Sequence, residues 1–339
     1  MHYLITGHTG FKGAWLTLLL QSQGHSVSGL ALDPEPGSLF ERAEIASDLV
    51  HDVRQDIRNA EDTASAISMI QPDAVIHLAA QPLVRESYRQ PRLTFETNVM
   101  GTLNVIEGVS HAMSVKAHVV VTTDKVYRNV NRAEGYREDE PLGGDDPYSA
   151  SKAMADILAQ SWTTSFSGPP TAIARAGNVI GGGDVCQDRL FVDLLSSFVA
   201  GTPASIRYPD AVRPWQHVLD CVSGYIALAE ALCAGRGLGQ WNFGPGPESF
   251  VPVRAIADQA AALWGEGATW VNASGKNHPH EANLLALDAT KAQAELNWHN
   301  RLSFDESVAW TVDWQKHVSR EGQLPRSVTM QQIADFANR

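Results

Sequence analysis

Short apolar runs alternate with longer helical patterns through the first half of the chain, and this alternation constrains the fold more than any other feature. Five runs of β-branched and aliphatic residues, bounded by Gly, Asp or Pro, are predicted to be buried strands, at 3–6, 26–32, 74–78, 118–122 and 171–174. Stretches with helical spacing lie between them, at 11–23, 60–70, 91–113 and 147–165. Strands and helices that alternate in this way predict a doubly wound parallel sheet of the α/β class.

The character of the sequence changes after Gly177. A triple glycine at 181–183 and a series of prolines break the next segment into shorter pieces, at Pro203, Pro209, Pro214, Pro245 and Pro247. We therefore predict a first domain over residues 1–177, with return segments around 214–245, and a smaller C-terminal lobe over residues 178–339. Helical patterns that are expected to cover this lobe lie at 253–263, 289–296 and 304–317.

The composition of the 339 residues argues against several classes of partner. There are 26 Lys and Arg against 38 Asp and Glu, a net charge of −12, and no basic run, so nucleic acid is not an expected partner. The three cysteines, Cys186, Cys221 and Cys233, form no Cys-x-x-Cys pair, so neither a disulfide framework nor structural zinc is expected. With no charged leader and no apolar run long enough to span a bilayer, we expect a cytoplasmic protein with no membrane partner.

The first predicted strand leads directly into a glycine-rich turn. Gly7, Gly10 and Gly13 stand at GxxGxxG spacing, with Thr9 and Phe11 between them, and a helical pattern follows. Glycines at such a turn let the backbone approach a pyrophosphate, which then lies at the helix N-terminus. We therefore expect these five residues to bind a dinucleotide. A simple tight turn between strand and helix is the alternative.

The second predicted strand is followed by a carboxylate that distinguishes between dinucleotides. Asp33 stands 20 residues beyond Gly13, where a carboxylate accepts hydrogen bonds from both ribose hydroxyls and repels a 2′-phosphate. Pro34 comes next, so no Arg is placed to pair with such a phosphate. The sequence therefore favours NAD over NADP, and a surface-loop aspartate is the alternative.

A Tyr-x-x-x-Lys pair opens the helical stretch at 147–165. Tyr148 and Lys152 are four residues apart and therefore lie on one face of the helix. The pKa of a phenol is ordinarily about 10, and a neighbouring ammonium and a positive nicotinamide ring both favour its phenolate form. Tyr148 is therefore predicted to accept a hydroxyl proton during hydride transfer, whereas an exposed pair without chemical role is the alternative.

Polar residues also follow the fourth predicted strand. The run at 118–122 is followed by Thr123, Asp124 and Lys125, and the carboxyl ends of parallel strands form the sheet edge where ligands bind. Polar and charged side chains have a chemical use at this edge. A salt bridge between Asp124 and Lys125 with no chemical role is the alternative.

Together these features resemble the extended short-chain dehydrogenase/reductases, a Rossmann fold, and among them the chain most resembles the CDP-glucose 4,6-dehydratase family. The TDK triplet at 123–125 is specific, because related epimerases usually read Ser-Ser/Thr at this strand end and dTDP-glucose dehydratases read TDE. The matching segments run from end to end: TGHTGFKGAWL (6–16), HLAAQPLVRESY (77–88), TNVMGT (97–102), TTDKVY (122–127), GYRE (135–138), LGGDDPYSASKA (142–153), ARAGNVIGGGD (174–184), RPWQHVL (213–219), WNFGP (241–245) and LDATKA (287–292).

The resemblance implies an NAD-dependent hydro-lyase that converts CDP-glucose to CDP-4-keto-6-deoxyglucose and water. Tyr148, assisted by Lys152 and Thr123, would take the proton of the sugar 4-hydroxyl while hydride passes from C4 to NAD⁺. The 4-ketone acidifies the C5 proton, and loss of that proton and of the C6 hydroxyl needs one base and one acid. Lys125 and Asp124 are the candidates, and the sequence leaves the division of these two roles open.

A nucleotide-sugar substrate carries a diphosphate, which an acidic protein must meet with local arginines. Arg189 and Arg213 match the nucleotide-sugar lobe of the family, and Asn178 would hold a phosphate or sugar oxygen. Gln81 and Arg85 follow the third strand and are expected near the sugar, although Arg85 alone fits an ordinary surface residue equally well. The remaining expected contacts are His217 with the substrate, and Asp56, Ile57, Ala79 and Ala80 with the cofactor.

The sequence departs from the family in two places. Val185 and Cys186 stand where the family usually has Trp-Ala, and residues 129–134 replace a Trp-rich segment. Both differences fall where the family selects the sugar and the nucleobase of its substrate. The segments expected to carry out hydride transfer match the family.

Two other functions remain as alternatives: a nucleotide-sugar 4-epimerase or reductase of the same fold, and a non-catalytic NAD-binding sensor. An epimerase would not need Asp124 and Lys125 as an acid-base pair, and a sensor would be expected to lack Tyr148 or Lys152. We assign no metal, because His278 and His280 have no further ligands near by in the sequence. A homodimer is expected through a four-helix bundle of the helices at 91–113 and 147–165.

Overall fold

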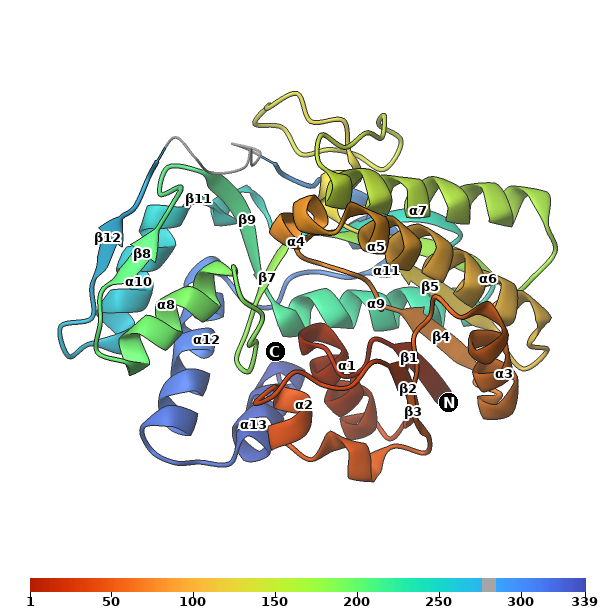
Figure 1. The fold of residues 1–339 in the computed structure, drawn as a ribbon, viewed down its shortest axis with the longest axis horizontal. Helices are drawn as coiled ribbons and strands as arrows, with labels where there is room; N and C mark the ends of the chain where they lie inside the picture. Colours follow the sequence, from red (N-terminus) through yellow and green to blue (C-terminus); the bar gives the residue numbers. More distant parts are fainter. Residues whose placement is uncertain (276–284) are drawn as a thin grey trace.

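Residues 2–176 supply six strands of a parallel sheet, and a later strand completes it. The computed structural model describes residues 1–275 and 285–339. Seven strands pair in the order β10-β6-β5-β4-β1-β2-β3, and every neighbouring pair is parallel (Figure 1). Their bounds are β1 His2–Thr6, β2 Ser26–Ala31, β3 Asp52–Arg54, β4 Ala74–His77, β5 Ala117–Val121, β6 Thr171–Ala176 and β10 Gly239–Phe243.

Helices cover both faces of this sheet, which explains why its central strands are almost continuously apolar. On one face α1 (Phe11–Ser22) packs against α9 (Val218–Cys233), and α9 contacts β4, β5 and β6. On the other face lie α3 (Ala60–Ile70), α6 (Gly101–His111) and α7 (Pro147–Ser165). The predicted doubly wound α/β fold is confirmed.

One predicted helix is not regular. The stretch predicted at 91–113 consists of α5 (Pro91–Phe95), one π-helical turn η2 (Glu96–Met100) and α6. The π turn directs the buried Asn98 side chain inward, where its Nδ2 donates to the carbonyl of Gln81 at 3.1 Å and to Oγ of Ser151 at 2.9 Å. Such turns often occur at functional sites, and this one joins the loop after β4 to α7.

A second lobe is built from two small sheets and three helices and lies to the left in Figure 1. Its own apolar core lies between these elements. In one sheet β9 pairs with β7 and β11, and in the other β8 pairs with β12. The bounds are β7 Asn178–Ile180, β8 Ala204–Ile206, β9 Val212–His217, β11 Phe250–Pro252, β12 Trp270–Asn272, α8 Leu190–Val199, α10 Val253–Trp264 and α12 Phe304–Ser319.

The C-terminal half of the chain is shared between the two lobes. β10 joins the large sheet beside β6, and α11 (Thr290–Leu296) contacts β10. α13 (Pro325–Ala337) packs against α1 and α2 (Leu39–Arg42). Residues 178–339 therefore supply the second lobe and part of the first, and the boundary at 177 stays a prediction. Four short elements complete the described part of the chain: η1 Ile45–Asp48, α4 Val84–Arg89, η3 Asp124–Val126 and η4 Pro247–Ser249.

The strand order reverses at β1. β2 and β3 follow on one side of β1, whereas β4, β5 and β6 follow on the other. In open α/β sheets a crevice forms at the carboxyl ends of the strands where the order reverses. The fold therefore places the ligand crevice at the ends of β1 and β4.

Candidate active site

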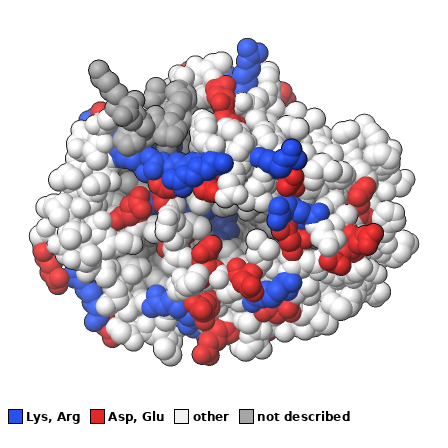
Figure 2. Space-filling view, in the orientation of Figure 1, with Lys and Arg blue, Asp and Glu red and all other residues white. Residues whose placement is uncertain are grey.

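A cleft of about 740 Å³ runs along the carboxyl edge of the large sheet and continues into the second lobe. Its walls include the glycine-rich turn, the residues after β4, β5 and β6, the start of α7 and the residues around α8 and β8. Figure 2 shows this face of the molecule hollowed at its centre, with Lys and Arg side chains on the rim among Asp and Glu side chains. Most of the site residues predicted from the sequence line this one cleft.

The glycine-rich turn forms a tight cradle at one end of the cleft. Gly7 has φ +76°, and a Cβ at this position would lie 2.8 Å from the backbone nitrogen of Ala79. A Cβ on Gly13 would lie 2.3 Å from the carbonyl oxygen of Gly7. α1 begins here with no side-chain cap and no acidic residue in its first turn. Its first N–H groups are therefore available to an anion such as a diphosphate.

Asp33 lies at the rim of the cleft rather than in its wall. It is exposed and follows β2, and the wall includes its neighbours Leu32 and Glu35. Thr9 connects the glycine-rich turn to this segment, because its Oγ1 donates to the carbonyl oxygen of Leu32 at 3.1 Å.

A second carboxylate stands in the wall, just beyond β3. Asp56 accepts hydrogen bonds from Nε and Nη2 of Arg58 at 2.9 and 2.6 Å, and these bonds lower the pKa of Asp56. Ile57, Ala79 and Ala80 line the same part of the cleft. The structure thus brings these predicted cofactor residues together beside the glycine-rich turn.

Tyr148 and Lys152 lie on the first two turns of α7, and both are buried at the cleft wall. The helix starts here because Pro147 occupies its first turn and a carboxylate oxygen of Asp146 accepts from the backbone N–H of Ser149 at 2.9 Å. Nζ of Lys152 donates to the carbonyl oxygen of Val121 at 2.9 Å. The lysine is thereby fixed beneath the end of β5.

Burial dominates the electrostatics of this pair. It raises the pKa of Tyr148 to about 12, against the lowering effect of a hydrogen bond with Thr123. It also lowers the pKa of Lys152 to about 8, an effect that the ammonium of Lys12 reinforces and the carboxylate of Asp156 opposes. The strongest influence that lowers the pKa of Tyr148 is thus Thr123, whereas the sequence argument gave this part to Lys152.

Thr123, Asp124 and Lys125 form the short turn η3 (Asp124–Val126) and its cap, directly after β5. Oγ1 of Thr123 donates to Oδ1 of Asp124 at 2.9 Å. Asp124 is only 1% exposed, and its Oδ2 has no hydrogen-bond partner in the described part of the chain. Lys125 is half-buried and also lines the cleft. A buried carboxylate oxygen without a partner is costly unless something in the cleft uses it.

A buried ion pair holds this turn from below, and the sequence reasoning missed it. Asp156 accepts from Nε and Nη2 of Arg175, both at 2.8 Å, and from Oγ1 of Thr122 at 2.9 Å. Nη1 of Arg175 donates to the hydroxyl of Tyr127 at 2.8 Å. The network connects both ends of the TTDKVY segment to α7 and β6. The sequence signal that could have identified this ion pair is the presence of Asp156 within the helical stretch at 147–165 and of Arg175 within an apolar strand.

Three of the predicted substrate residues line the cleft from the second lobe: Asn178, Arg189 and Arg213. Nη1 of Arg189 donates to Oδ2 of Asp184 at 2.6 Å, and Nη1 of Arg213 donates to the carbonyl oxygen of Val212 at 3.0 Å. Arg189 also acts electrostatically on Tyr148. Guanidinium groups therefore face the region where an anionic ligand would reach the tyrosine.

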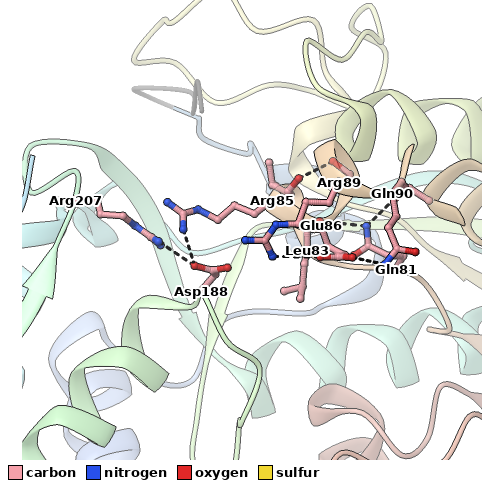
Figure 3. A network of polar contacts seen from close by, with 11 residues as sticks. Gln81, Leu83, Arg85, Glu86, Arg89, Gln90, Asp188 and Arg207 are labelled. Carbon is pink, nitrogen blue, oxygen red and sulfur yellow. Dashed lines mark hydrogen bonds and ion pairs between the residues drawn. The ribbon is translucent and has the colours of Figure 1, made fainter. Parts of the chain in front are cut away.

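Gln81 and Arg85 line the cleft from the first lobe. The side-chain amide of Gln81 donates to the carbonyl oxygen of Leu83 and to Oγ1 of Thr94. Its side-chain oxygen accepts from the backbone N–H of Leu83. Gln81 therefore fixes the conformation of the loop before α4. Arg85 instead extends across the cleft toward Asp188, which Arg207 approaches from the other side (Figure 3). Asp188 and Arg207 belong to no recognisable sequence motif, because their contact joins segments that no local pattern connects.

The structure does not bring His217 to the cleft. Its imidazole is fully buried, packs edge-on against Trp15 and Trp310, and caps α9 by accepting the backbone N–H of Leu219 at 3.3 Å. A side chain held in this way cannot contact a substrate, so the substrate role expected for His217 is corrected. The motif match reflects a helix cap.

The described ranges 1–275 and 285–339 contain no group of three or more His, Cys, Asp or Glu side chains placed to hold a metal ion. His278 and His280 lie outside the described residues. Across the same ranges, each helix is too short or too polar to cross a membrane.

The cleft thus combines the glycine-rich turn, a buried Tyr–Lys pair, the side chains of Asp124 and Lys125 and several arginines. Tyr148 can exchange a proton at one position of a bound ligand, while Asp124 and Lys125 offer an acid and a base at another. This arrangement suits proton transfers at neighbouring atoms of one anionic substrate.

Comparison with known proteins agrees with this geometry. Residues 3–244 match the model of the NAD dependent epimerase/dehydratase family. The chain is 46% identical over 323 residues to a CDP-glucose 4,6-dehydratase of Salmonella typhimurium, an alignment that covers 92% of this chain and 89% of that protein. It is 28% identical over 329 residues to a dTDP-glucose 4,6-dehydratase of Xanthomonas campestris, covering 92% of both.

Solved structures share the fold. A UDP-glucose 4-epimerase of Thermus thermophilus in complex with NAD superposes with a TM-score of 0.82 at 25% identity, covering 93% of this chain and 99% of that one. A dTDP-glucose 4,6-dehydratase of Bacillus anthracis in complex with NAD superposes with a TM-score of 0.79 at 24% identity, covering 93% and 96%.

Proposed function

The chain belongs to the NAD dependent epimerase/dehydratase family, and from this premise we propose that it is an NAD-dependent CDP-glucose 4,6-dehydratase that releases water and CDP-4-keto-6-deoxyglucose. The observation that carries the proposal is the Thr123–Asp124–Lys125 turn, which lies in the same cleft as Tyr148 and Lys152. A simple oxidation or epimerisation at C4 needs only Tyr148 and Lys152. Elimination needs a further acid and base, and the turn supplies both.

The cradle at the glycine-rich turn fits NAD. We assign the diphosphate to Gly7, Gly10 and Gly13, since the uncapped start of α1 offers N–H groups and a Cβ on Gly7 or Gly13 would clash with the backbone. Asp33 at the rim is assigned to the ribose hydroxyls. Bound there, NAD supplies the hydride acceptor for oxidation at C4 and the hydride donor for reduction at C6.

Tyr148 takes the proton of the sugar 4-hydroxyl in the first step. Burial raises the pKa of Tyr148 to about 12, so the phenol needs help from its surroundings to act as a base. Thr123 gives part of that help through its hydrogen bond, and a positively charged nicotinamide would add to it. Lys152, held on the carbonyl oxygen of Val121, keeps a positive group beneath the site.

Asp124 and Lys125 carry out the elimination. The 4-ketone acidifies the C5–H bond, and the base removes that proton while the acid protonates the departing C6 hydroxyl, so that the C6–O bond breaks and water leaves. We assign the acid role to Asp124, because its unpartnered Oδ2 is buried among groups that line the cleft, and the base role to Lys125. Reduction at C6 and return of a proton to C5 complete a cycle with no net oxidation.

A panel of nucleotide sugars tests this proposal. Purified protein is incubated with NAD and with CDP-, UDP-, GDP- or dTDP-hexoses, and the masses of the products are measured by mass spectrometry. Loss of one water from CDP-glucose is the expected result. Conversion to an isomer of unchanged mass would favour an epimerase, and no conversion of any sugar would overturn the proposal.

We also propose a cytoplasmic homodimer in which η2, α6 and α7 of two subunits form a four-helix bundle. Met100, Met154 and Ile157 lie on these elements and are 50%, 49% and 53% exposed, a set of large apolar side chains that a second copy would cover. The three cysteines are free, which suits a reducing compartment. In sedimentation at micromolar concentration we expect twice the 36.8 kDa mass of one chain, and a monomer alone would contradict the dimer.

A further inference from the structure

A carboxylate and two guanidinium groups meet in the cleft at a place that the proposed chemistry does not use. Oδ1 of Asp188 accepts from Nη1 of Arg207 at 2.9 Å and from Nη1 of Arg85 at 3.0 Å. Figure 3 shows the side chain of Arg207 coming from the left and that of Arg85 from the right, so that both guanidinium groups meet at one carboxylate oxygen. Arg207 follows β8 in the second lobe, Arg85 belongs to α4 in the first, and all three line the cleft.

The backbone at Asp188 is held in an uncommon conformation. Its φ is +63°, in the left-handed region that residues other than glycine rarely adopt. Residues in such conformations persist where the surrounding structure fixes them, and they are concentrated at ligand sites. The loop before α8 therefore presents this carboxylate in one fixed direction.

The contact leaves hydrogen-bonding groups for a ligand. Both arginines use Oδ1 of Asp188, and no residue in the described part of the chain donates to its Oδ2. Arg207 reaches Asp188 through Nη1, so its other N–H groups can donate elsewhere. The side chains of Asp188 and Arg207 are 29% and 24% exposed, so a ligand in the cleft can reach both.

The cleft that holds this pair also has apolar wall residues, among polar ones such as Ser205 and Tyr208. Leu190, Phe191, Ile206 and Val253 line the same cleft, and Ile206 directly precedes Arg207. The ring of Phe191 packs edge-on against Trp215, with centroids 6.4 Å apart. An apolar surface with one polar edge is the environment that a flat heterocyclic base requires.

We propose that Asp188 and Arg207 read the nucleobase of the substrate and select cytosine. This inference rests on the proposed function and deepens it. The pair offers one acceptor, Oδ2, followed by two N–H donors of the guanidinium. The edge of cytosine offers the complement, with the N4 amino group as donor and N3 and O2 as acceptors, and carboxylates commonly accept from N4 of cytosine.

Uracil and thymine do not fit this edge. They present O4, N3–H and O2, so O4 would face the carboxylate and N3–H would face an N–H donor. A site built for one hydrogen-bond pattern rejects the other because its own polar groups are left unpaired.

Binding of nucleoside diphosphates without a sugar tests the inference. The Kd values of CDP and UDP are measured by calorimetry on the NAD-loaded protein. Wild type is expected to bind CDP about 10- to 100-fold more tightly than UDP, and Asp188→Asn should remove most of this preference. Asp193→Asn is the matched control, because it removes an equal charge from the cleft wall near Arg207 and should keep the preference.

A second variant separates base reading from phosphate binding. Arg207→Lys keeps the charge but loses the planar guanidinium with its paired N–H donors, so it should weaken the binding of CDP more than the binding of UDP. Equal weakening of both ligands would assign Arg207 to the diphosphate and overturn the inference, as would a wild type that does not distinguish CDP from UDP or an Asp188→Asn variant that still does. Because binding needs no turnover, failure of the proposed dehydration would be seen separately, in the product masses.

Discussion

Replacing Asp124 with Asn separates dehydration from every simpler reaction of this fold. The substitution keeps the size of a side chain that is 1% exposed, and the amide oxygen can still accept the hydrogen bond from Thr123. What it removes is a transferable proton at the C6 oxygen. A positioned acid contributes about 10²- to 10⁴-fold to rate, which corresponds to about 3–5 kcal/mol of barrier at 1.36 kcal/mol for each factor of ten.

The two halves of the reaction can be followed separately in this variant. In a single turnover with CDP-glucose, absorbance of the reduced nicotinamide reports oxidation at C4, and exchange with deuterated solvent reports loss of the C5 proton. Oxidation should proceed, because Tyr148 and Lys152 are unchanged. Loss of water should slow by about 10²- to 10⁴-fold. Reduced cofactor should therefore accumulate together with a 4-keto sugar that keeps its C6 oxygen.

Glu86→Gln is the matched control, because Glu86 is another carboxylate of the cleft wall that this mechanism does not use. It should eliminate water at the wild-type rate. If Asp124→Asn also eliminates water at that rate, Asp124 is not the acid and the reasoning from its buried, unpartnered oxygen is refuted.

Three further changes test other parts of the account. Tyr148→Phe should retain NAD but slow oxidation at C4 by at least about 10²-fold, since the ring remains and the proton acceptor is lost; wild-type turnover would contradict the assignment. Gly13→Ala should lower the free energy of unfolding by about 1–3 kcal/mol and weaken NAD binding, because the new Cβ would lie 2.3 Å from the carbonyl oxygen of Gly7. Thermal unfolding with and without NAD measures both effects, and an unchanged melting temperature would count against the cradle. Burial raises the pKa of Asp220 to about 7, so the folded state binds a proton that the unfolded state releases, and stability should fall as pH rises from about 4 through 7. The free energy of unfolding, measured by denaturation across that pH range, should fall in wild type and not in Asp220→Asn. Identical pH profiles of the two proteins would refute this prediction.

The regular parts of the fold could be predicted because local sequence specifies them. α3 and α7 have the predicted bounds, since Asn59 and Asp146 cap their first turns. β3 (Asp52–Arg54) was missed, because it is a short edge strand of partly exposed residues with no apolar run. α9 was missed for the opposite reason: it is buried on most of its surface, and its sequence is apolar almost throughout.

The candidate site was predictable where motif residues act near their own position in the sequence. The glycine-rich turn, Tyr148 and Lys152, and the turn after β5 all lie at the cleft. His217 was misplaced because a matching segment does not say which side chains face a ligand. The contact between Asp188 and Arg207 depends on how the loop before α8 meets β8, which no spacing rule describes.

Transfer of a label within one sugar shows whether the hydride removed from C4 returns to C6 of the same molecule. CDP-glucose carrying deuterium at C4 is incubated with the NAD-loaded enzyme, and the product is examined by mass spectrometry and NMR. Dehydration by this mechanism yields a product that has lost one water and carries the deuterium at C6, because the hydride removed from C4 returns to C6 of the same molecule. A product of unchanged mass with inverted C4, or a dehydrated product without deuterium at C6, would contradict the account.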